Sequence, residues 1–297
     1  MRALVLDAAR REAENQRYLA ASPAQQLADY HRYAKIFRDQ PGIPADFQGQ
    51  WRTRWAGAEF VVPLRAATLW LDWDYALSLS IHDADVKDGY QAFLRHPQRP
   101  QLFVDVGANY GTHSLLMLKH GVPTLSFEPL AGCIDYFAEI AALNGVQARC
   151  QNIALGSEEG SIELVHPRNQ TWLATTRNRL QAEPGTELAQ HRCPLSTLDQ
   201  VLKDISLERV LLKIDTEGHE LEVLRGGASF LARVQPYIYF ECLDLPLLHQ
   251  ISAFLGSLGY VVASASHSPF APPPAQAPSD PRITNFLAIP ARPWSTH

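Results

Sequence analysis

Acidic side chains are concentrated in the segment LLKIDTEGHE, residues 211–220, which contains Asp215 and Glu217 together with Lys213 and His219. A carboxylate or an imidazole can remove the proton of an alcohol, which is a poor nucleophile until it is deprotonated. Carboxylate oxygens are also the ligands that Mg2+ binds, and a bound Mg2+ lowers the pKa of a coordinated hydroxyl. The segment therefore indicates activation of a hydroxyl group, either by a base or by a metal ion.

A further acidic side chain, Glu241, ends the apolar run YIYFE. Because neighbouring parallel strands end at the same edge of a sheet, Glu241 and Asp215 are expected to lie close together. We predict Asp215, Glu217, Glu241 and His219 as alternative general bases, with Lys213 neutralising the carboxylates. Like charges and burial would raise the pKa of such a base. The second alternative is a Mg2+ ion held by Asp215 and Glu241.

The segment FVDVGANYGTHS, residues 103–114, joins an apolar run to a helix through a glycine turn. In an open α/β sheet the first turn of this kind forms the ligand crevice. A dinucleotide fingerprint needs a glycine where this chain has Asn109, and no Lys or Arg lies near the turn to balance a phosphate. Asp105 favours a cationic ligand instead. S-adenosylmethionine (SAM) carries a sulfonium and an ammonium, and the N–H groups of the turn can hold its carboxylate.

Glu128 closes the next apolar run, TLSFEP, 21 residues after Gly107. An acidic residue about 20 residues after the turn is where ribose hydroxyls are bound in this kind of sheet. The alternative is that Asp105 caps the amides of its own turn and that Glu128 begins a loop. The two linked signals favour a SAM site, while a nicotinamide-dependent oxidoreductase on the same sheet is the competing class.

The elements that position these residues alternate between short apolar strands and amphipathic helices after residue 100, which is typical of a parallel sheet covered on both faces. The last strand follows a proline-rich loop, residues 268–282, with no room for a crossover helix, so we predict that this strand is antiparallel. The predicted strands are LFVDVG (102–107), TLSFEP (124–129), ARCQNIAL (148–155), VLLKID (210–215), YIYFECL (237–243), YVVASA (260–265) and TNFLAIP (284–290).

We predict two domains, an accessory region over residues 1–98 and a larger domain over residues 99–292. A helical extension such as the first region could provide a homodimer contact. The elements expected in the first region are a helix over 22–40, which opens with Ser-Pro, strands over 51–64 and 67–80, and a helix over 85–96.

Composition limits the class of protein. The 297-residue chain has 26 basic and 31 acidic side chains and a formal net charge of -5, which gives no electrostatic footprint for nucleic acid. Its four cysteines lack the spacings of zinc sites. The amino terminus shows neither a signal sequence nor a membrane span, so we expect a cytoplasmic protein with no membrane partner.

Five of these segments together resemble the FkbM family of SAM-dependent methyltransferases, over roughly residues 100–290. They are FVDVGANYG, LSFEP, LLKIDTEGHELEVLRGG, YFEC and TNFLAIP, and IDxEGxE is the most specific. The resemblance implies an α/β fold, the Rossmann-like seven-stranded class I methyltransferase sheet with its last strand antiparallel. It also implies O-methylation of a hydroxyl on a small molecule such as a sugar, a polyketide or another secondary metabolite.

The resemblance further implies where the cofactor is bound, and it does not extend to residues 1–98. Catechol-type methyltransferases place metal ligands at the same strand ends, so the Mg2+ alternative is an analogy by position. A non-catalytic SAM-binding module on the same fold is a third alternative. The implied cofactor residues are Asp105, Gly107, Ala108, Asn109, Tyr110 and Gly111 at the methionine end, Glu128 at the ribose, and Asn152 and Ala154 near the adenine.

Overall fold

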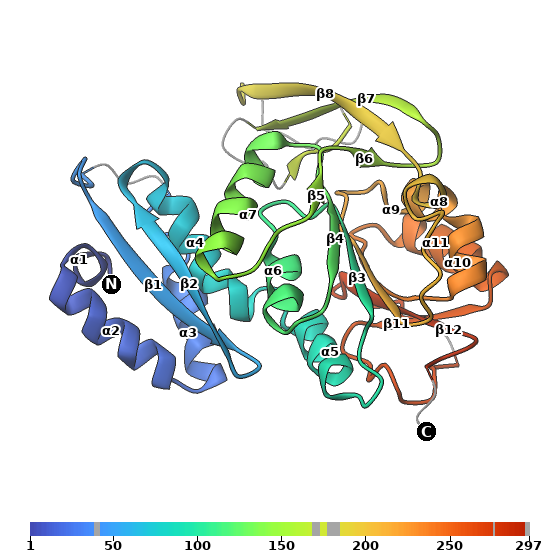
Figure 1. Cartoon of the computed structure of the whole chain (residues 1–297), viewed down its shortest axis with the longest axis horizontal. Coiled ribbons are helices and arrows are strands. Elements are labelled where there is room, and N and C mark those ends of the chain that lie inside the picture. Colours follow the sequence, from blue (N-terminus) through green and yellow to red (C-terminus); the bar gives the residue numbers. More distant parts are fainter. Residues whose placement is uncertain (39–41, 168–172, 177–184, 276, 295–297) are drawn as a thin grey trace. The chain divides into compact units, whose positions relative to one another are not determined.

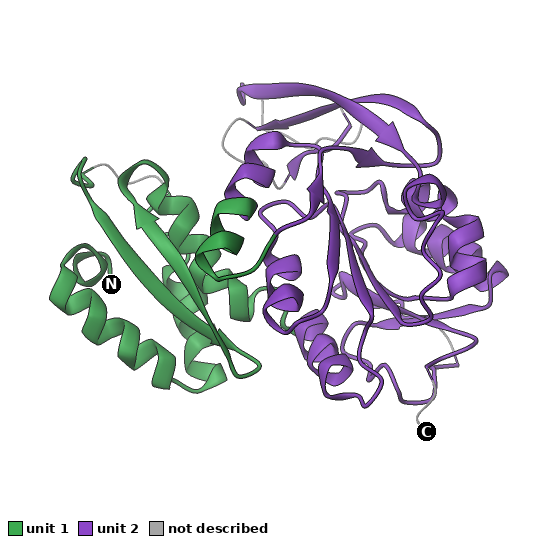
Figure 2. Ribbon diagram, in the orientation of Figure 1, with its two compact units in different colours: residues 1–84, 138–147 green, residues 85–137, 148–297 purple. Residues whose placement is uncertain are grey.

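The structure, a computed structural model, describes residues 1–38, 42–167, 173–176, 185–275 and 277–294 (Figure 1). The chain divides into two compact units (Figure 2). The first contains Met1–Ala84 and Ala138–Gln147, and the second contains Asp85–Phe137 and Ala148–His297. The helix expected over 85–96, which the sequence assigned to the accessory region, groups with the second unit.

The first unit combines helices with a two-stranded antiparallel sheet. Ser22 caps its third helix through a reciprocal capping box with Gln25, and Pro23 occupies the first helical turn. This helix was expected over 22–40 but ends at Tyr33, and residues 39 and 40 lie outside the described residues. The elements are α1 (Arg2–Leu6), α2 (Ala8–Ala20), α3 (Pro23–Tyr33), β1 (Gln48–Trp55), β2 (Ala58–Arg65), the 3-10 turn η1 (Ala66–Thr68) and α4 (Leu69–Ile81).

The strand predicted over 67–80 is wrong, because this stretch forms helix α4. Most of the helix is buried, so its apolar residues surround it instead of marking one face, and such a run cannot be told from a buried strand by periodicity. The start of the helix is fixed by Asp72, which is fully buried. Its carboxylate accepts hydrogen bonds from the Arg65 backbone and guanidinium and from the Thr68 hydroxyl.

Asparagine side chains close both edges of the β1–β2 sheet at one position. Asn15 accepts the N–H of Arg52 (2.9 Å) and donates to its carbonyl (2.7 Å). Asn144, in the segment Ala138–Gln147 of the same unit, makes the same pair of bonds with Val61, both at 2.8 Å. Arg52 and Val61 face each other in the strand ladder. The two amide side chains therefore occupy the hydrogen-bonding groups that a further strand would need.

The second unit contains the predicted seven-stranded sheet, in the order β11-β12-β10-β9-β3-β4-β5. Numbered along the chain, this is the order 6-7-5-4-1-2-3 of a Rossmann-like class I methyltransferase sheet. β12 is antiparallel to both β10 and β11, as predicted, while the other neighbouring strands are parallel. The strands are β3 (Leu102–Val106), β4 (Thr124–Phe127), β5 (Cys150–Gln151), β9 (Val210–Ile214), β10 (Tyr237–Glu241), β11 (Tyr260–Ser264) and β12 (Asn285–Pro290).

Both faces of this sheet are covered by helices, which lie on its two sides in Figure 1. On one face, residues such as Val104, Leu212 and Ile238 form a core with α8 to α11. On the other face, Tyr90 of α5 packs against Phe103 of β3. Burial on both faces explains why the strands read as continuous apolar runs. The helices are α5 (Ala84–Arg95), α6 (Thr112–Lys119), α7 (Ala131–Leu143), α8 (Leu198–Val201), α9 (Glu220–Arg225), α10 (Ala228–Val234) and α11 (Leu245–Ser257).

A second, three-stranded sheet was not predicted, and the strand expected over 148–155 is divided between the two sheets. This sheet has the order β6-β8-β7, with β6 (Ala154–Leu155), β7 (Gly160–Pro167) and β8 (Leu188–Ser196). Between β5 and β6, the Asn152 amide donates to the carbonyls of Glu128 (3.1 Å) and Pro129 (2.8 Å), which turns the chain from one sheet to the other.

The proline-rich loop 268–282 contains neither a helix nor a strand in the part that the structure describes. Among the described helices, none has both the length and the apolar character needed to cross a bilayer.

Candidate active site

The glycine turn after β3 brings this strand close to the end of β9. Gly107 has φ +78°, and a Cβ at this position would lie 1.8 Å from the carbonyl oxygen of Asp215. Gly111 has φ +75°, and its Cβ would lie 2.1 Å from the ring of Phe137. Only glycine can therefore occupy these two positions, because a side chain would meet atoms of the protein itself. Asn109 between them is also left-handed, with φ +48°.

The backbone amides of the turn, which were predicted to hold the carboxylate of SAM, mostly have acceptors within the protein. The N–H groups of Gly107 and Ala108 donate to the carbonyl of Phe127, and that of Gly111 donates to the carbonyl of Ala108. The N–H of Asn109 donates to Glu128. These four amides already have acceptors, so a carboxylate could bind them only by displacing these bonds.

Glu128 is buried behind the turn, and its carboxylate accepts the N–H groups of Asn109 and Leu130, both at 2.8 Å. Burial raises the pKa of this carboxyl to about 7, with a further contribution from the charge of Asp105, while the two backbone donors oppose the rise. Each carboxylate oxygen can accept a second hydrogen bond. Glu128 is thus able to bind a ligand hydroxyl while it holds the turn.

Asp105 lies inside the sheet, 1% exposed, and has partners within the protein. The hydroxyl of Ser114 donates to its carboxylate (2.5 Å) and also contacts the hydroxyl of Ser126 (2.8 Å). Burial raises the pKa of Asp105, and the charges of His113 and Lys213 act against this rise together with the Ser114 hydrogen bond. Asp105 therefore affects the site through its charge, which raises the pKa of Glu128.

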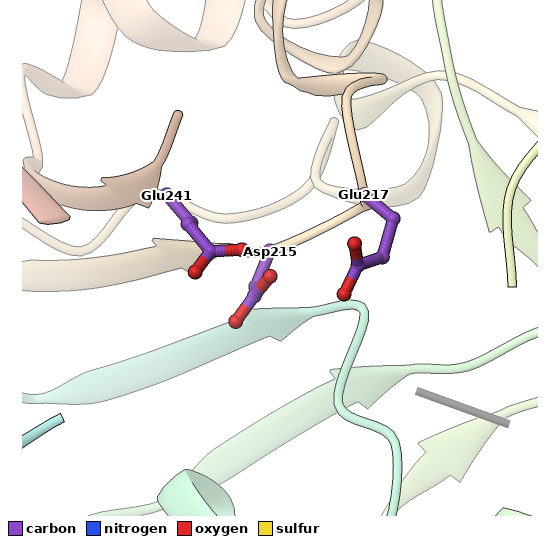
Figure 3. A group of neighbouring side chains, drawn as sticks. All are labelled: Asp215, Glu217 and Glu241. Carbon is purple, nitrogen blue, oxygen red and sulfur yellow. The ribbon is translucent and has the colours of Figure 1, made fainter. Parts of the chain in front are cut away.

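Three acidic side chains predicted for catalysis come together beyond the carboxyl ends of β9 and β10 (Figure 3). One carboxylate oxygen each from Asp215, Glu217 and Glu241 lies within 4.8 Å of the others. Lys213 is fully buried, and its Nζ donates to Asp215 at 2.9 Å. His219 does not belong to this group. Its Nε2 lies 3.2 Å from where a Cβ on Gly156 would be, next to the smaller sheet.

Glu217 occupies a strained backbone position, with φ +52°. A non-glycine residue in this region costs about 1–2 kcal/mol relative to glycine. Burial raises the pKa of its carboxyl to about 8, helped by the charges of Asp215 and Glu220 and opposed by Lys213. A carboxyl group with such a pKa can exchange a proton near neutral pH, which an exposed glutamate cannot do efficiently.

Other predicted residues lie close to this edge of the sheet. Tyr110 lies within the turn and packs edge-on against Tyr136 at 5.1 Å between ring centres. Asn152 has the bonds to the end of β4 described above, and Ala154 begins β6. Sequence reasoning missed Thr175, whose hydroxyl donates to the carbonyl of Glu217 at 2.9 Å. No sequence signal connects residues that are 42 positions apart.

The sheet order, the glycine turn and the acidic edge define a class I methyltransferase domain. The chain belongs to the FkbM methyltransferase family, since the model of the methyltransferase FkbM domain matches residues 105–262. Two relatives are similar to part of the chain. "Methyltransferase sdnD" from Sordaria araneosa is 37% identical over an alignment of 163 residues, with 44% of this chain and 61% of that protein covered.

The second relative, "Methyltransferase 1" from Beauveria bassiana, is 34% identical over an alignment of 144 residues, with 41% of this chain and 57% of that protein covered. The matched region thus spans less than two thirds of either relative.

Solved structures are similar at lower identity. The FkbM methyltransferase from Methylobacillus flagellatus KT is 14% identical, with 75% of this chain and 54% of that chain covered and a TM-score of 0.39. A SAM-dependent methyltransferase from Agrobacterium tumefaciens is 10% identical, with 86% and 72% covered and a TM-score of 0.42. These likenesses are too distant to add to the assignment, which rests on the family model.

Proposed function

We propose that this protein is a SAM-dependent O-methyltransferase that acts on a hydroxyl group of a small molecule. The observation that carries the proposal is the group of three carboxylates, Asp215, Glu217 and Glu241, beside the glycine turn in a chain of the FkbM family. Buried or half-buried acids that lie this close together are costly unless they share a proton or a cation, which is typical of a functional site.

The residues beside the turn fit SAM. The side-chain oxygen of Asn109 is buried and has no hydrogen-bond partner in the described part of the chain, so it can accept a hydrogen bond from an ammonium group. Glu128 can accept the ribose hydroxyls, and we propose Asn152 and Ala154 as the residues next to the adenine. Bound SAM would supply the methyl group and its sulfonium leaving group.

The chain's own contribution is to orient the acceptor and to take its proton. Methyl transfer to oxygen is an in-line displacement, so most of the rate comes from alignment and from deprotonation of the hydroxyl. Glu217 has the raised pKa of a base that works near neutral pH. The proton transfer moves negative charge from Glu217 to the acceptor oxygen, and Lys213 beside Asp215 offsets part of the negative charge of the site.

A metal-assisted version of the same reaction uses the same side chains. Asp215, Glu217 and Glu241 offer carboxylate oxygens at a spacing that suits one divalent cation such as Mg2+. There the ion would lower the pKa of a coordinated hydroxyl. Treatment with EDTA separates the two versions, since it abolishes turnover of a Mg2+ enzyme and leaves a carboxylate-base enzyme active.

The proposal is tested by calorimetry and by transfer of a labelled methyl group. We expect SAM and S-adenosylhomocysteine to bind and NAD not to bind, and we expect label to reach one or more members of a panel of sugars and polyketides. Asp215→Asn keeps an acceptor for Lys213 and should abolish turnover, whereas Asp204→Asn, at an exposed position, should not. Tight NAD binding without SAM binding would refute the proposal. SAM binding without transfer to any acceptor would indicate a non-catalytic module.

A further inference from the structure

The turn that carries Glu217 is held from two sides by residues outside the acidic group. On one side, a single carboxylate oxygen of Glu220 accepts the N–H of Thr216 (2.9 Å), the hydroxyl of Thr216 (3.0 Å) and the N–H of Gly218 (3.0 Å). On the other side, the hydroxyl of Thr175 donates to the carbonyl of Glu217 itself at 2.9 Å. The peptide that follows Glu217 is thereby held at both its carbonyl and its N–H.

Thr175 is itself held in place by the smaller sheet. Its N–H and carbonyl form an antiparallel bridge with Val165 of β7, at 3.1 and 2.8 Å. The side chain is 7% exposed, so the hydroxyl works in a site that water reaches poorly. The bond from Thr175 to Glu217 therefore transmits the position of β7 to the active-site turn.

The bond from the Thr175 hydroxyl stabilises a strained conformation of Glu217. A glutamate at φ +52° is less stable than a glycine would be, and such strain persists only where the surroundings impose it. In this conformation the carboxylate lies with those of Asp215 and Glu241. Without the Thr175 hydroxyl, the peptide between Glu217 and Gly218 keeps only the bond from its N–H to Glu220. It can then rotate toward a more stable backbone region, which carries the side chain away from the group.

We propose that Thr175 is a positioning residue, whose hydroxyl holds the Glu217 peptide in the conformation that brings its carboxylate into the active site. This inference rests on the proposed function of Glu217 and adds the smaller sheet to the parts of the protein that the reaction needs. The acting group is the hydroxyl, because the methyl group of Thr175 makes no hydrogen bond.

Two matched variants test the role of the hydroxyl. Thr175→Val keeps the shape and removes the hydroxyl, while Thr175→Ser keeps the hydroxyl and removes a methyl group. With the acceptor found by the labelled-methyl assay, kcat of Thr175→Val should fall at least about tenfold, as small misplacements of catalytic groups cost up to about a hundredfold. The Kd of SAM should change less than about twofold, and Thr175→Ser should keep kcat within about threefold of the wild type.

A double variant and a crystal structure complete the test. In a Glu217→Gln background, Thr175→Val should cause little further loss, because both changes act through the same carboxylate. Equal losses in Thr175→Val and Thr175→Ser, or an unchanged kcat in Thr175→Val, would overturn the proposal. If the wild type transfers no methyl group, the proposed function fails separately. Crystal structures of the two variants then decide, since Glu217 should leave the left-handed region in Thr175→Val only.

Discussion

Glu128 gives the sharpest prediction, because its ionisation should change cofactor binding and stability in opposite directions. Its carboxyl has a pKa of about 7 in the folded protein. If the ionised form binds the ribose hydroxyls, about nine tenths of the protein is competent at pH 8 and about one tenth at pH 6. The apparent Kd of SAM should therefore rise about tenfold when the pH is lowered from 8 to 6, since affinity scales with the competent fraction.

The matched variant is Glu128→Gln, which cannot titrate. Its amide leaves one backbone N–H, that of Asn109 or Leu130, facing an NH2 group, so SAM binding should be weaker at every pH. The pH dependence that arises from this residue should disappear. Titration of the ammonium group of SAM occurs with both proteins and cancels in the comparison. Calorimetry at four pH values from 6 to 8 measures the difference.

Stability of the unliganded protein provides the second readout. The folded state keeps the Glu128 proton up to about pH 7, whereas the unfolded chain releases it near the ordinary value of 4.5. The free energy of unfolding should therefore fall by about 3 kcal/mol relative to Glu128→Gln as the pH rises through this window. Urea unfolding at pH 5 and pH 8 measures it. An identical pH dependence of SAM binding in both proteins, or a relative stability that rises with pH, would refute the reasoning.

Three further predictions concern the scaffold. Gly107→Ala should lower the melting temperature and abolish SAM binding, because its Cβ would lie 1.8 Å from a backbone oxygen. The control is Gly121→Ala, at φ +76°, whose Cβ would meet no atom within 4 Å. It should cost only about 1–2 kcal/mol of backbone strain. Asn144→Ala should reduce the free energy of unfolding measured in urea by about 1–3 kcal/mol, since the partly buried N–H and carbonyl of Val61 both lose their bond to this side chain; an unchanged midpoint would contradict the edge-closing role. Asp72→Ala should lower the free energy of unfolding by about 2 kcal/mol or more, because Arg65 and Thr68 lose the carboxylate at the start of α4. Thermal unfolding followed by circular dichroism should then show loss of helix at a lower temperature than in the wild type.

The large sheet could be predicted from sequence because its strands are buried on both faces and are bounded by turn residues. The same physical property misled the prediction at α4, since a helix buried nearly all round has the same continuous apolar run. The strands β7 and β8 were missed because exposed residues interrupt the apolar pattern of each, in the first half of β7 and in the middle of β8. The division of residues 148–155 depends on the Asn152 side chain, which binds carbonyls 23 and 24 positions away.

In the candidate site too, features that follow from neighbouring strands could be predicted, whereas contacts between residues far apart in the sequence could not. Proximity of Asp215 and Glu241 follows from the rule that adjacent parallel strands end together, and the structure brings them together with Glu217. The direction of His219 could not be derived, because it depends on contact with Gly156 near the smaller sheet. The occupied amides of the turn were also missed, because the acceptors of three of the four come from the end of β4.

Buried carboxylates lower the stability of a fold, so their surroundings show what the protein retains them for. Glu128 and Glu220 are nearly fully buried, yet each accepts backbone N–H groups that would otherwise need partners. These two acids therefore organise the turns on either side of the site. Glu217 accepts no such donor among the described hydrogen bonds and sits in a strained conformation with a raised pKa. An acid that is kept at this cost without a structural partner is the one expected to meet the substrate.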